Sequence, residues 1–383
     1  MAASAQYVAG FLSSHTIGNE VRRLAMSTSS RPWWTWAWPV LAFTSLIVTA
    51  IFGATGVIAA IAGVILIAAV FAAVYHAEVL AHRIGEPFGT LVLALAVTII
   101  EVALIVSIMV GVSADKAGLA RDTVFAVVMI VCNGIVGLCL LWGGMRHHEQ
   151  GFQVQGASAA LAVLAPLTIL TMILPNYTLR TPGPAFSTSQ LVFASIVSLV
   201  LYCSFVFVQT LRHRDYFLPL ENTDEEHASP PSIGVALISF GLLLVSLIAI
   251  VGLAKMLTPA VENIILSLGA PKAVVGIAIA LLVLMPESLA ALRAAQANRL
   301  QTSLNLALGS ALASIGLTIP AVAAVSILLE QQLDLGLDGK EIVLLALTLL
   351  AGIITLGTGR TTVLQGIVHL VIFAVFLFMT IVP

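Results

Sequence analysis

The chain has 383 residues, of which 60% are hydrophobic and 9% charged, and its net charge is −2. Apolar runs close to the roughly 20 residues that cross about 30 Å of hydrocarbon recur from residue 39 to the C-terminus, which predicts an all-α, polytopic integral membrane protein. The sequence has no basic patch, which excludes a nucleic-acid partner, and its cysteines lie in apolar runs without the spacing of a disulfide framework or a zinc site.

The N-terminal segment, residues 1–38, is more polar than the rest of the chain. It lacks the short apolar core and small-residue cleavage site of a secretory signal, so we expect a retained cytoplasmic extension. Tryptophans gather between positions 33 and 38, just before the first apolar run. Indole rings favour the headgroup region of a bilayer, and these residues therefore predict an anchor at the membrane interface.

Apolar runs bounded by charged residues, Gly and Pro predict about eleven transmembrane helices. The expected spans are 39–55, 57–79, 87–112, 122–143, 156–175, 188–211, 233–257, 272–296, 302–327, 341–357 and 362–382. With the N-terminus inside, more arginines and lysines fall on the cytoplasmic side than on the other, as the positive-inside rule requires. Within these runs, Gly134, Gly137 and Gly309 are expected to permit close approach of helices in lipid.

The longest polar stretch after the N-terminus is an acidic segment between two groups of five spans. We expect a cytoplasmic extension at 1–38, an extra transmembrane helix at 39–56, a first repeat at 57–211, an acidic cytoplasmic connector at 212–231 and a second repeat at 232–383. Because five spans is an odd number, corresponding helices cross in opposite directions, which makes the repeats inverted in topology. The connector lacks the Asp-x-Asp-x-Asp-Gly spacing of a calcium loop, so a solvated linker is favoured over a calcium sensor.

Two glutamates lie in the middle of apolar runs that resemble each other. Residues 89–101 read GTLVLALAVTIIE and residues 275–287 read VGIAIALLVLMPE, so Glu101 and Glu287 close matching stretches. A charge at membrane depth is costly and normally serves function, and inverted repeats bring such residues together near the midplane. Pro286 removes one backbone donor, and discontinuous helices at corresponding places in the two halves are the expected architecture for an ion site.

These residues also predict a chemistry. A carboxylate removed from water is driven toward its neutral form, a second carboxylate nearby acts in the same direction, and a bound cation reverses both effects. Protons and a cation therefore compete for Glu101 and Glu287, which is a basis for obligatory exchange by alternating access.

The stretch HAEVLAHRIGEPFGTLVLALAVTIIE at 76–101, followed by MPESLAALRAAQANRLQTSLNLALGSALAS at 285–314, resembles the two repeats of the cation/proton exchangers within the calcium/cation antiporter superfamily. The likeness is greatest to the bacterial calcium/proton, or sodium-potassium/proton, branch. In that family each repeat carries a signature such as Gly-Asn-Ala-Thr-Glu, whose glutamate binds the cation or exchanges protons for it. The resemblance implies this role for Glu101 and Glu287.

The resemblance also implies supporting polar residues. The next block of each repeat contributes neutral oxygen donors, which are Asn133, Ser310 and Ser314 here. Glu78 matches an acidic residue of the family, and with His76 close by it suggests a proton pathway, although an interfacial residue that reaches water fits equally well. Asn305 is a candidate pathway residue, with interhelical hydrogen bonding as the equal alternative.

The signature is incomplete in this chain. Its Gly-Asn pair is replaced by Val97-Thr98 in the first repeat and by Val283-Leu284 in the second, so only Thr98 keeps a side-chain oxygen at these positions. Calcium takes six to eight oxygen ligands, and missing amide oxygens have to be replaced by water, backbone carbonyls or other side chains.

We therefore expect a secondary antiporter that exports Ca²⁺ from the cytoplasm in exchange for H⁺, in a bacterial inner (plasma) membrane, with a cytoplasmic N-terminus. The alternatives are a Na⁺/K⁺ to proton antiporter at the same site and a passive cation channel. No hydrolase motif is present, so an enzyme is not expected. The expected partners are the transported cation, protons and the lipid bilayer, without a cofactor, and the oligomeric state is left open.

Overall fold

The computed structural model describes residues 32–85, 88–109, 118–219, 230–269, 271 and 273–382. Half of the acidic connector, residues 220–229 with Glu221, Asp224, Glu225, Glu226 and His227, lies outside the described residues, as does most of the N-terminal extension. The helices are α2 (Trp34–Phe52), α3 (Gly56–Ile84), α4 (Phe88–Met109), α5 (Leu119–Met129), α6 (Val136–His147), α7 (Val154–Thr168), α8 (Thr188–Phe207), α9 (Ile233–Ser267), α10 (Ala273–Gln296), α11 (Leu300–Ala313), α12 (Ile319–Leu328), α13 (Gly339–Leu356) and α14 (Val363–Ile381).

Short irregular turns and two strands complete the chain between these helices. π-helical turns occur at η2 (Ile130–Ile135), η3 (Ile169–Ile173), η5 (Val208–Arg212) and η7 (Ser314–Thr318), 3₁₀ turns at η4 (Leu174–Tyr177) and η6 (Arg214–Phe217), and strands at β1 (Gln150–Gly151) and β2 (Arg360–Thr361). Several π-turns lie inside a span, so α5, η2 and α6 together form one membrane crossing, Ala120–His147.

The expected number of spans is confirmed. Within the described ranges, 10 helical segments are long and apolar enough to cross a membrane, and α4 with its apolar stretch Leu95–Val106 is the remaining one. Three boundaries differ from expectation by five residues or more, and one of them is the end of α3, at Ile84 rather than at 79. Helix α2 begins at Trp34 rather than at 39, so the tryptophans belong to its first turns, and α9 runs ten residues past 257 because an apolar chain keeps its backbone hydrogen bonds in helical form even around Pro259.

The two halves follow the same order. In each half the glutamate helix, α4 or α10, is followed by a crossing that contains a π-turn, η2 or η7, and then by two further spans. Strands β1 and β2 pair antiparallel and join the loop after α6 to the loop after α13, at one end of the molecule. At the other end, Ala185 pairs with Asp334. The fold is thus two inverted five-helix repeats preceded by one extra helix.

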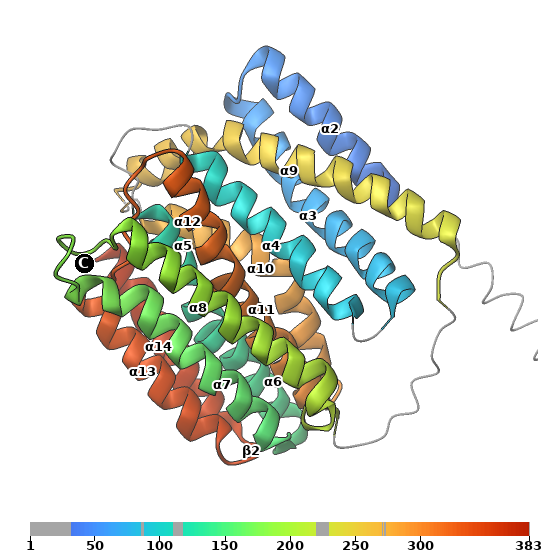
Figure 1. Cartoon of the computed structure of the whole chain (residues 1–383). Coiled ribbons are helices and arrows are strands. Elements are labelled where there is room, and N and C mark those ends of the chain that lie inside the picture. The colour runs from blue at the N-terminus through green and yellow to red at the C-terminus, as the bar shows by residue number, and fades with distance from the viewer. Residues whose placement is uncertain are drawn as a thin grey trace, which may run out of the picture.

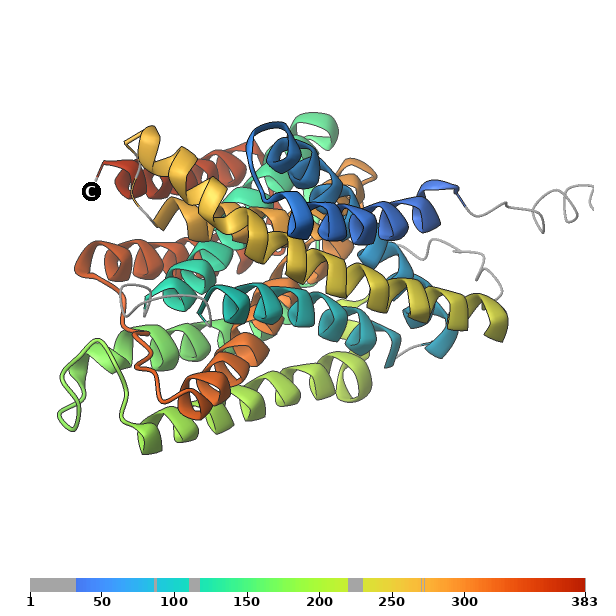
Figure 2. The ribbon, with the colours of Figure 1, turned by 90° about the horizontal axis from the view of Figure 1, so that it is seen from above.

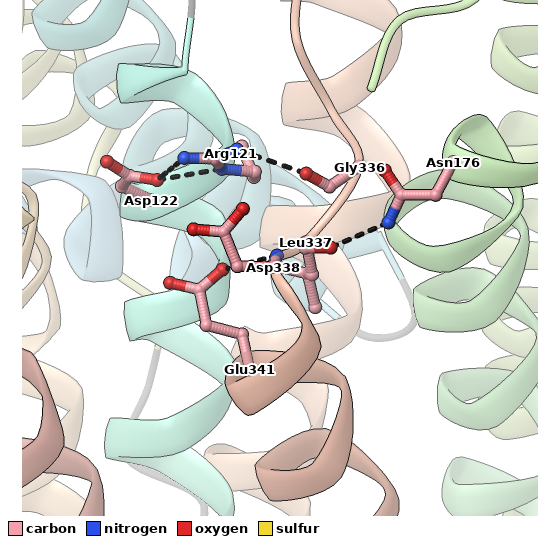
Figure 3. A network of polar contacts seen from close by, with 7 residues as sticks. All are labelled: Arg121, Asp122, Asn176, Gly336, Leu337, Asp338 and Glu341. Atoms are coloured by element: carbon pink, nitrogen blue, oxygen red, sulfur yellow. Dashed lines mark hydrogen bonds and ion pairs between the residues drawn. The ribbon is translucent and has the colours of Figure 1, made fainter. Parts of the chain in front are cut away.

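Polar contacts also tie the halves together at the second end (Figure 3). Arg121, which forms an ion pair with Asp122 at 2.8 Å, donates from Nη1 to the Gly336 carbonyl at 3.0 Å. Asn176 Nδ2 donates to the Leu337 carbonyl at 2.6 Å. The 329–338 loop of the second half is therefore held by α5 and η4 of the first.

Buried apolar side chains form two clusters rather than one. The first comes from α2, α3, α4 and α9, which lie side by side in Figures 1 and 2, and the second from α5 to α8 and α10 to α14. Both glutamate helices contribute to both clusters: Leu104 and Val283 belong to the first, and Ile105 and Leu284 to the second. Helices α4 and α10 therefore mark the boundary between the two packed groups.

Candidate functional site

Glu101 lies near the middle of α4 and is 1% exposed. Its Oε2 accepts a hydrogen bond from Ser314 Oγ at 2.7 Å, a contact that joins the first half to the second. Among the described residues, its Oε1 has no hydrogen-bond partner. An unpaired buried carboxyl oxygen is costly, and binding a proton or a cation at this atom would remove that cost.

Ser314 reaches Glu101 because η7 packs against α4. Thr318 lies at the other end of the same π-turn, near the same carboxyl. Its hydroxyl is also buried and has no hydrogen-bond partner in the described part of the chain. π-turns inside α-helices are frequent at functional sites, and this one directs two hydroxyls toward one glutamate.

Glu287 lies near the middle of α10, within electrostatic reach of Glu78 on α3 and of Glu101. The residue is partly exposed, but its Oε2 is buried and, within the described ranges, has no hydrogen-bond partner. Glu78 is exposed. Glu287 therefore interacts electrostatically with carboxyl groups from two other helices, α3 and α4.

This arrangement limits how a cation is held. In the described part of the chain, no group of three or more His, Cys, Asp or Glu side chains lies close enough to share a metal ion. A cation here would take one or two carboxylates and complete its shell with hydroxyls, backbone carbonyls and water, as hard cations do.

Other residues singled out in the sequence have other partners. Asn133 Nδ2 donates to Thr348 Oγ1 at 2.8 Å, and Asn305 Nδ2 donates to the Phe217 carbonyl at 2.6 Å. His76 is buried with Nε2 2.8 Å from the Thr35 carbonyl, so it faces α2. Asn305 thus bonds the turn η6 rather than a neighbouring helix, and its place in the pathway stays a prediction.

The remaining candidates lie close to the glutamates in sequence. Thr98 is buried one turn before Glu101 on α4. Ser310 is partly exposed on α11, about one turn before Ser314. Both lie on a helix that contributes to the site. Among the described residues, neither side chain forms a hydrogen bond to Glu101 or Glu287.

One architectural expectation was wrong. Helices α4 and α10 are continuous through Glu101 and Glu287, and Pro286 does not end α10. The irregular backbone lies instead in the next crossing of each half, at η2 and η7. A single proline in an apolar helix removes one hydrogen bond, and the neighbouring helices stabilise the rest.

The sequence reasoning missed two residues. Thr318 follows Ser314 by four positions, a spacing that places both on one helix face, and it could have been found on that ground. His369 is the one titratable residue of the last span and is buried, and a lone ionisable group in an apolar run was the available signal.

Comparison with known proteins identifies the family. The sodium/calcium exchanger protein family matches residues 52–211 and 238–382, which is most of the chain in two segments. The chain belongs to the sodium/calcium exchanger family. Exchangers of this family are transporters, and the two matched segments correspond to the two halves of the fold.

Relatives cover nearly the whole length of this exchanger. It is 48% identical over 368 residues to the putative ionic transporter y4hA of Sinorhizobium fredii, covering 94% of this chain and 99% of the relative. It is 36% identical over 349 residues to the sodium-potassium/proton antiporter ChaA of Escherichia coli, covering 88% and 93%.

Solved structures show the same fold. The exchanger aligns with the native YfkE structure at a TM-score of 0.68 and 15% identity, over 91% of this chain and 100% of that one. It aligns with the H⁺/Ca²⁺ exchanger CAX at a TM-score of 0.66 and 16% identity, over 90% and 88%. At such identities the likeness concerns the fold alone.

Proposed function

We propose that this exchanger is a secondary cation/proton antiporter whose exchange site is formed by Glu101 and Glu287. The observation that carries the proposal is the buried Glu101 carboxyl, bonded to Ser314 from the other half and within electrostatic reach of Glu287. A carboxylate so placed is a functional group by default in a membrane protein.

The proposed mechanism follows from charge compensation. Two carboxyls removed from water are stable when both are protonated or when a cation lies between them, and unstable when both are empty and charged. Each loaded form is electrically compensated and able to rearrange between the two sides, whereas the empty, doubly charged form is not. Cation and protons thus move in opposite directions through alternating access, and the exchange needs no cofactor.

Calcium is the first candidate cation. Two carboxylates balance one divalent ion, and the hydroxyls of Ser314 and Thr318 near Glu101 are suitable hard-oxygen ligands. We propose export from the cytoplasm across a bacterial inner membrane with the N-terminus inside, because the basic residues near the span ends favour that orientation.

Sodium or potassium is the second candidate. A relative that is 36% identical over 88% of this chain is named a sodium-potassium/proton antiporter. Thr98 and Leu284 stand where the family signature has Asn, so the side-chain amide oxygens that a calcium ion would use are missing, and only the Thr98 hydroxyl remains.

The experiment is proton flux in everted membrane vesicles that carry the protein. The vesicle interior is acidified by respiration, and a fluorescent pH probe reports proton release when Ca²⁺, Na⁺ or K⁺ is added separately. The expected result is cation-dependent proton release by the wild type, abolished in Glu101→Gln and in Glu287→Gln. Full flux in both variants would overturn the assignment of Glu101 and Glu287 as the exchange site.

A second measurement separates exchange from passive conduction. Purified protein in liposomes is given a proton gradient, and accumulation of the cation against its own gradient is followed. An antiporter drives the cation uphill, whereas a channel dissipates both gradients independently. Equilibration without uphill movement would replace the proposal by the channel alternative.

A further inference from the structure

Asn133 lies within a buried polar network on the side of η2 that faces the last two helices. Its Nδ2 donates to Thr348 Oγ1 on α13 at 2.8 Å, and its Oδ1 lies 3.1 Å from Nδ1 of His369 on α14. The His369 Nε2 lies 2.8 Å from Thr355 Oγ1. All these residues are buried.

The contacts determine the direction of the hydrogen bonds. Thr348 Oγ1 donates to the Leu344 carbonyl at 2.7 Å, so it accepts from the Asn133 amide nitrogen. The Asn133 Oδ1 is then an acceptor and requires a proton on His369 Nδ1. His369 therefore holds the oxygen of Asn133, the atom that a cation or a protonated carboxyl would otherwise use.

The inverted repeat gives Asn133 a counterpart. The aligned blocks VMIVCN at 128–133 and GSALAS at 309–314 end at Asn133 and at Ser314, and each end lies in the π-turn that follows a glutamate helix. Turn η7 packs against α4 as η2 packs against α10. Ser314 contacts Glu101, but Asn133 is held by His369 and Thr348 instead of by Glu287.

We propose that His369 is a positioning residue: it withdraws Asn133 from the exchange site in this conformation, and in the opposite conformation Asn133 turns to Glu287 as Ser314 turns to Glu101 here. The proposal rests on the proposed exchange function. Inverted repeats that exchange conformations make the two halves alternate in their contacts, and the structure shows one half with the contact and the other without it.

A π-turn allows such a rotation. It contains one residue more than an α-helical turn, and shifting that residue along the helix rotates the intervening side chains by about 100°. A buried amide that leaves one set of partners requires another. The Oε2 of Glu287 has no partner within the described ranges, and the backbone carbonyl of Cys132 faces the ring that Asn133 would leave.

The test is a double-mutant cycle on the full-length protein in liposomes, measuring KM for the cation and Vmax for cation-driven proton flux. In His369→Leu, Asn133 is released toward the site, and we expect KM to fall about three- to tenfold with a lower Vmax, the size of one or two lost hydrogen bonds. His369→Asn, which restores a donor near the Nδ1 position, returns KM toward the wild-type value.

The cycle separates positioning from a general structural role. In the Asn133→Ala background, His369→Leu should leave KM unchanged, because the residue through which it acts is gone. A KM shift of equal size in that background would overturn the proposal, as would an unchanged KM in both His369→Leu and Thr348→Val. Thr348→Val removes the second tether isosterically and serves if His369→Leu fails to fold.

The wild type and one control complete the design. Thr168→Val removes a buried hydroxyl whose bonds, within the described part of the chain, are to the Leu164 and Ala165 carbonyls of its own helix, and it should leave KM unchanged. Absence of flux in the wild type would overturn the proposed function together with this inference. Wild-type flux with an unaltered KM in the His369 and Thr348 variants would overturn the role of His369 alone.

Discussion

At Glu101 one hydroxyl, Ser314 Oγ, satisfies one carboxyl oxygen while the other oxygen has no hydrogen-bond partner among the described residues. This half-satisfied state suits a group that alternates between a proton and a cation. A fully bonded carboxylate would be held in its charged form, and a carboxyl without any donor would stay protonated. On the proposed exchange function, Ser314 is the residue that sets the balance between proton and cation at Glu101.

Ser314→Ala should weaken cation binding. Loss of the hydroxyl removes a donor to the ionised carboxyl and one possible oxygen ligand, so we expect KM for the cation to rise about three- to tenfold. Steady-state proton flux at a series of cation concentrations measures it. Ser246→Ala is the control, because among the described residues its buried hydroxyl bonds the Leu242 carbonyl of its own helix α9 and nothing else. An equal rise there would mean that loss of any buried hydroxyl has this effect.

Asn305→Ala should act on stability instead. Asn305 Nδ2 bonds the Phe217 carbonyl, and its Oδ1 accepts from Gln301 Nε2 at 2.9 Å. Loss of these bonds is expected to lower the free energy of unfolding by about 1–2 kcal/mol. A lower midpoint of thermal unfolding in detergent, with KM for the cation unchanged, is the expected result, and a shifted KM without a change in midpoint would return Asn305 to the transport pathway.

The glutamates could be predicted from the sequence, and the partners of the surrounding polar residues could not. An ionisable group is rare in a run that crosses hydrocarbon, and this rarity is what identified Glu101 and Glu287 in the sequence. The orientation of Asn133 depends on Thr348 and His369, more than 200 positions further along the chain. Such long-range pairs are set by the packing of α13 and α14, and no local pattern encodes them.

At the scale of elements, the crossing that follows each glutamate helix has a π-turn in its middle, whereas η3 and η5 lie at the ends of their spans. Turn η7 directs Ser314 and Thr318 toward α4, and η2 directs Asn133 away from α10. The sequence predicted irregular backbone at the site but placed it at Pro286. Proline is a visible signal, whereas a π-turn arises from one extra residue that any composition can hold.

Deletion of Leu317 should convert η7 into an ordinary helical turn. Because a π-turn is one inserted residue, its removal leaves the helices on both sides in register, while the relative direction of Ser314 and Thr318 changes by about 100°. We expect wild-type helix content by circular dichroism with loss of proton flux. Deletion of Ala323, in the regular part of α12, is the control: it rotates the rest of α12 relative to its neighbours and should lower expression of folded protein. Wild-type flux after the Leu317 deletion would contradict a role for the turn.

The glycines allow a second, independent prediction about how closely the helices approach one another. A Cβ at Gly366 on α14 would overlap the backbone of Leu141 on α6, whereas a Cβ at Gly309 would meet nothing within 4 Å. The expected close approach of helices is found at Gly137, where an added Cβ would lie 3.0 Å from the Cβ of His369. It is not found at Gly309, where a side chain has room.

Gly366→Ala should therefore lower stability by about 1–3 kcal/mol through overpacking. Gly309→Ala should be neutral or stabilise by up to about 1 kcal/mol through helix propensity. Thermal unfolding of both variants in the same detergent compares them directly. Equal midpoints would show that α6 and α14 separate easily, in disagreement with their close approach.

At the scale of the whole molecule, the two apolar clusters cut across the inverted repeats, because α9 of the second half packs with α2, α3 and α4. Helices α2, α3, α4 and α9 pack as one group and the remaining helices as another, and the site lies where the groups meet. Small relative movements of two packed groups change access to a site at their boundary without unpacking either one. The order and number of spans were predictable because bilayer thickness fixes helix length. The grouping was not, because it depends on which apolar faces meet.

Inverted topology makes a prediction about the two surfaces of the membrane. Leu179 lies in the loop after η4 and Arg360 in the loop after α13, and five spans separate them, so they must lie on opposite sides. Both are exposed, and the side chain of Arg360 forms a surface ion pair with Glu149, at 3.6 Å, which is of little value to stability. Single cysteines at these positions are introduced into a Cys203→Ser background, because Cys132 and Cys139 are buried. A membrane-impermeant maleimide should label Leu179→Cys in intact cells and Arg360→Cys in everted vesicles. Labelling of both from the same side would mean an even number of crossings between them, and the two halves could then not be inverted copies that share one site.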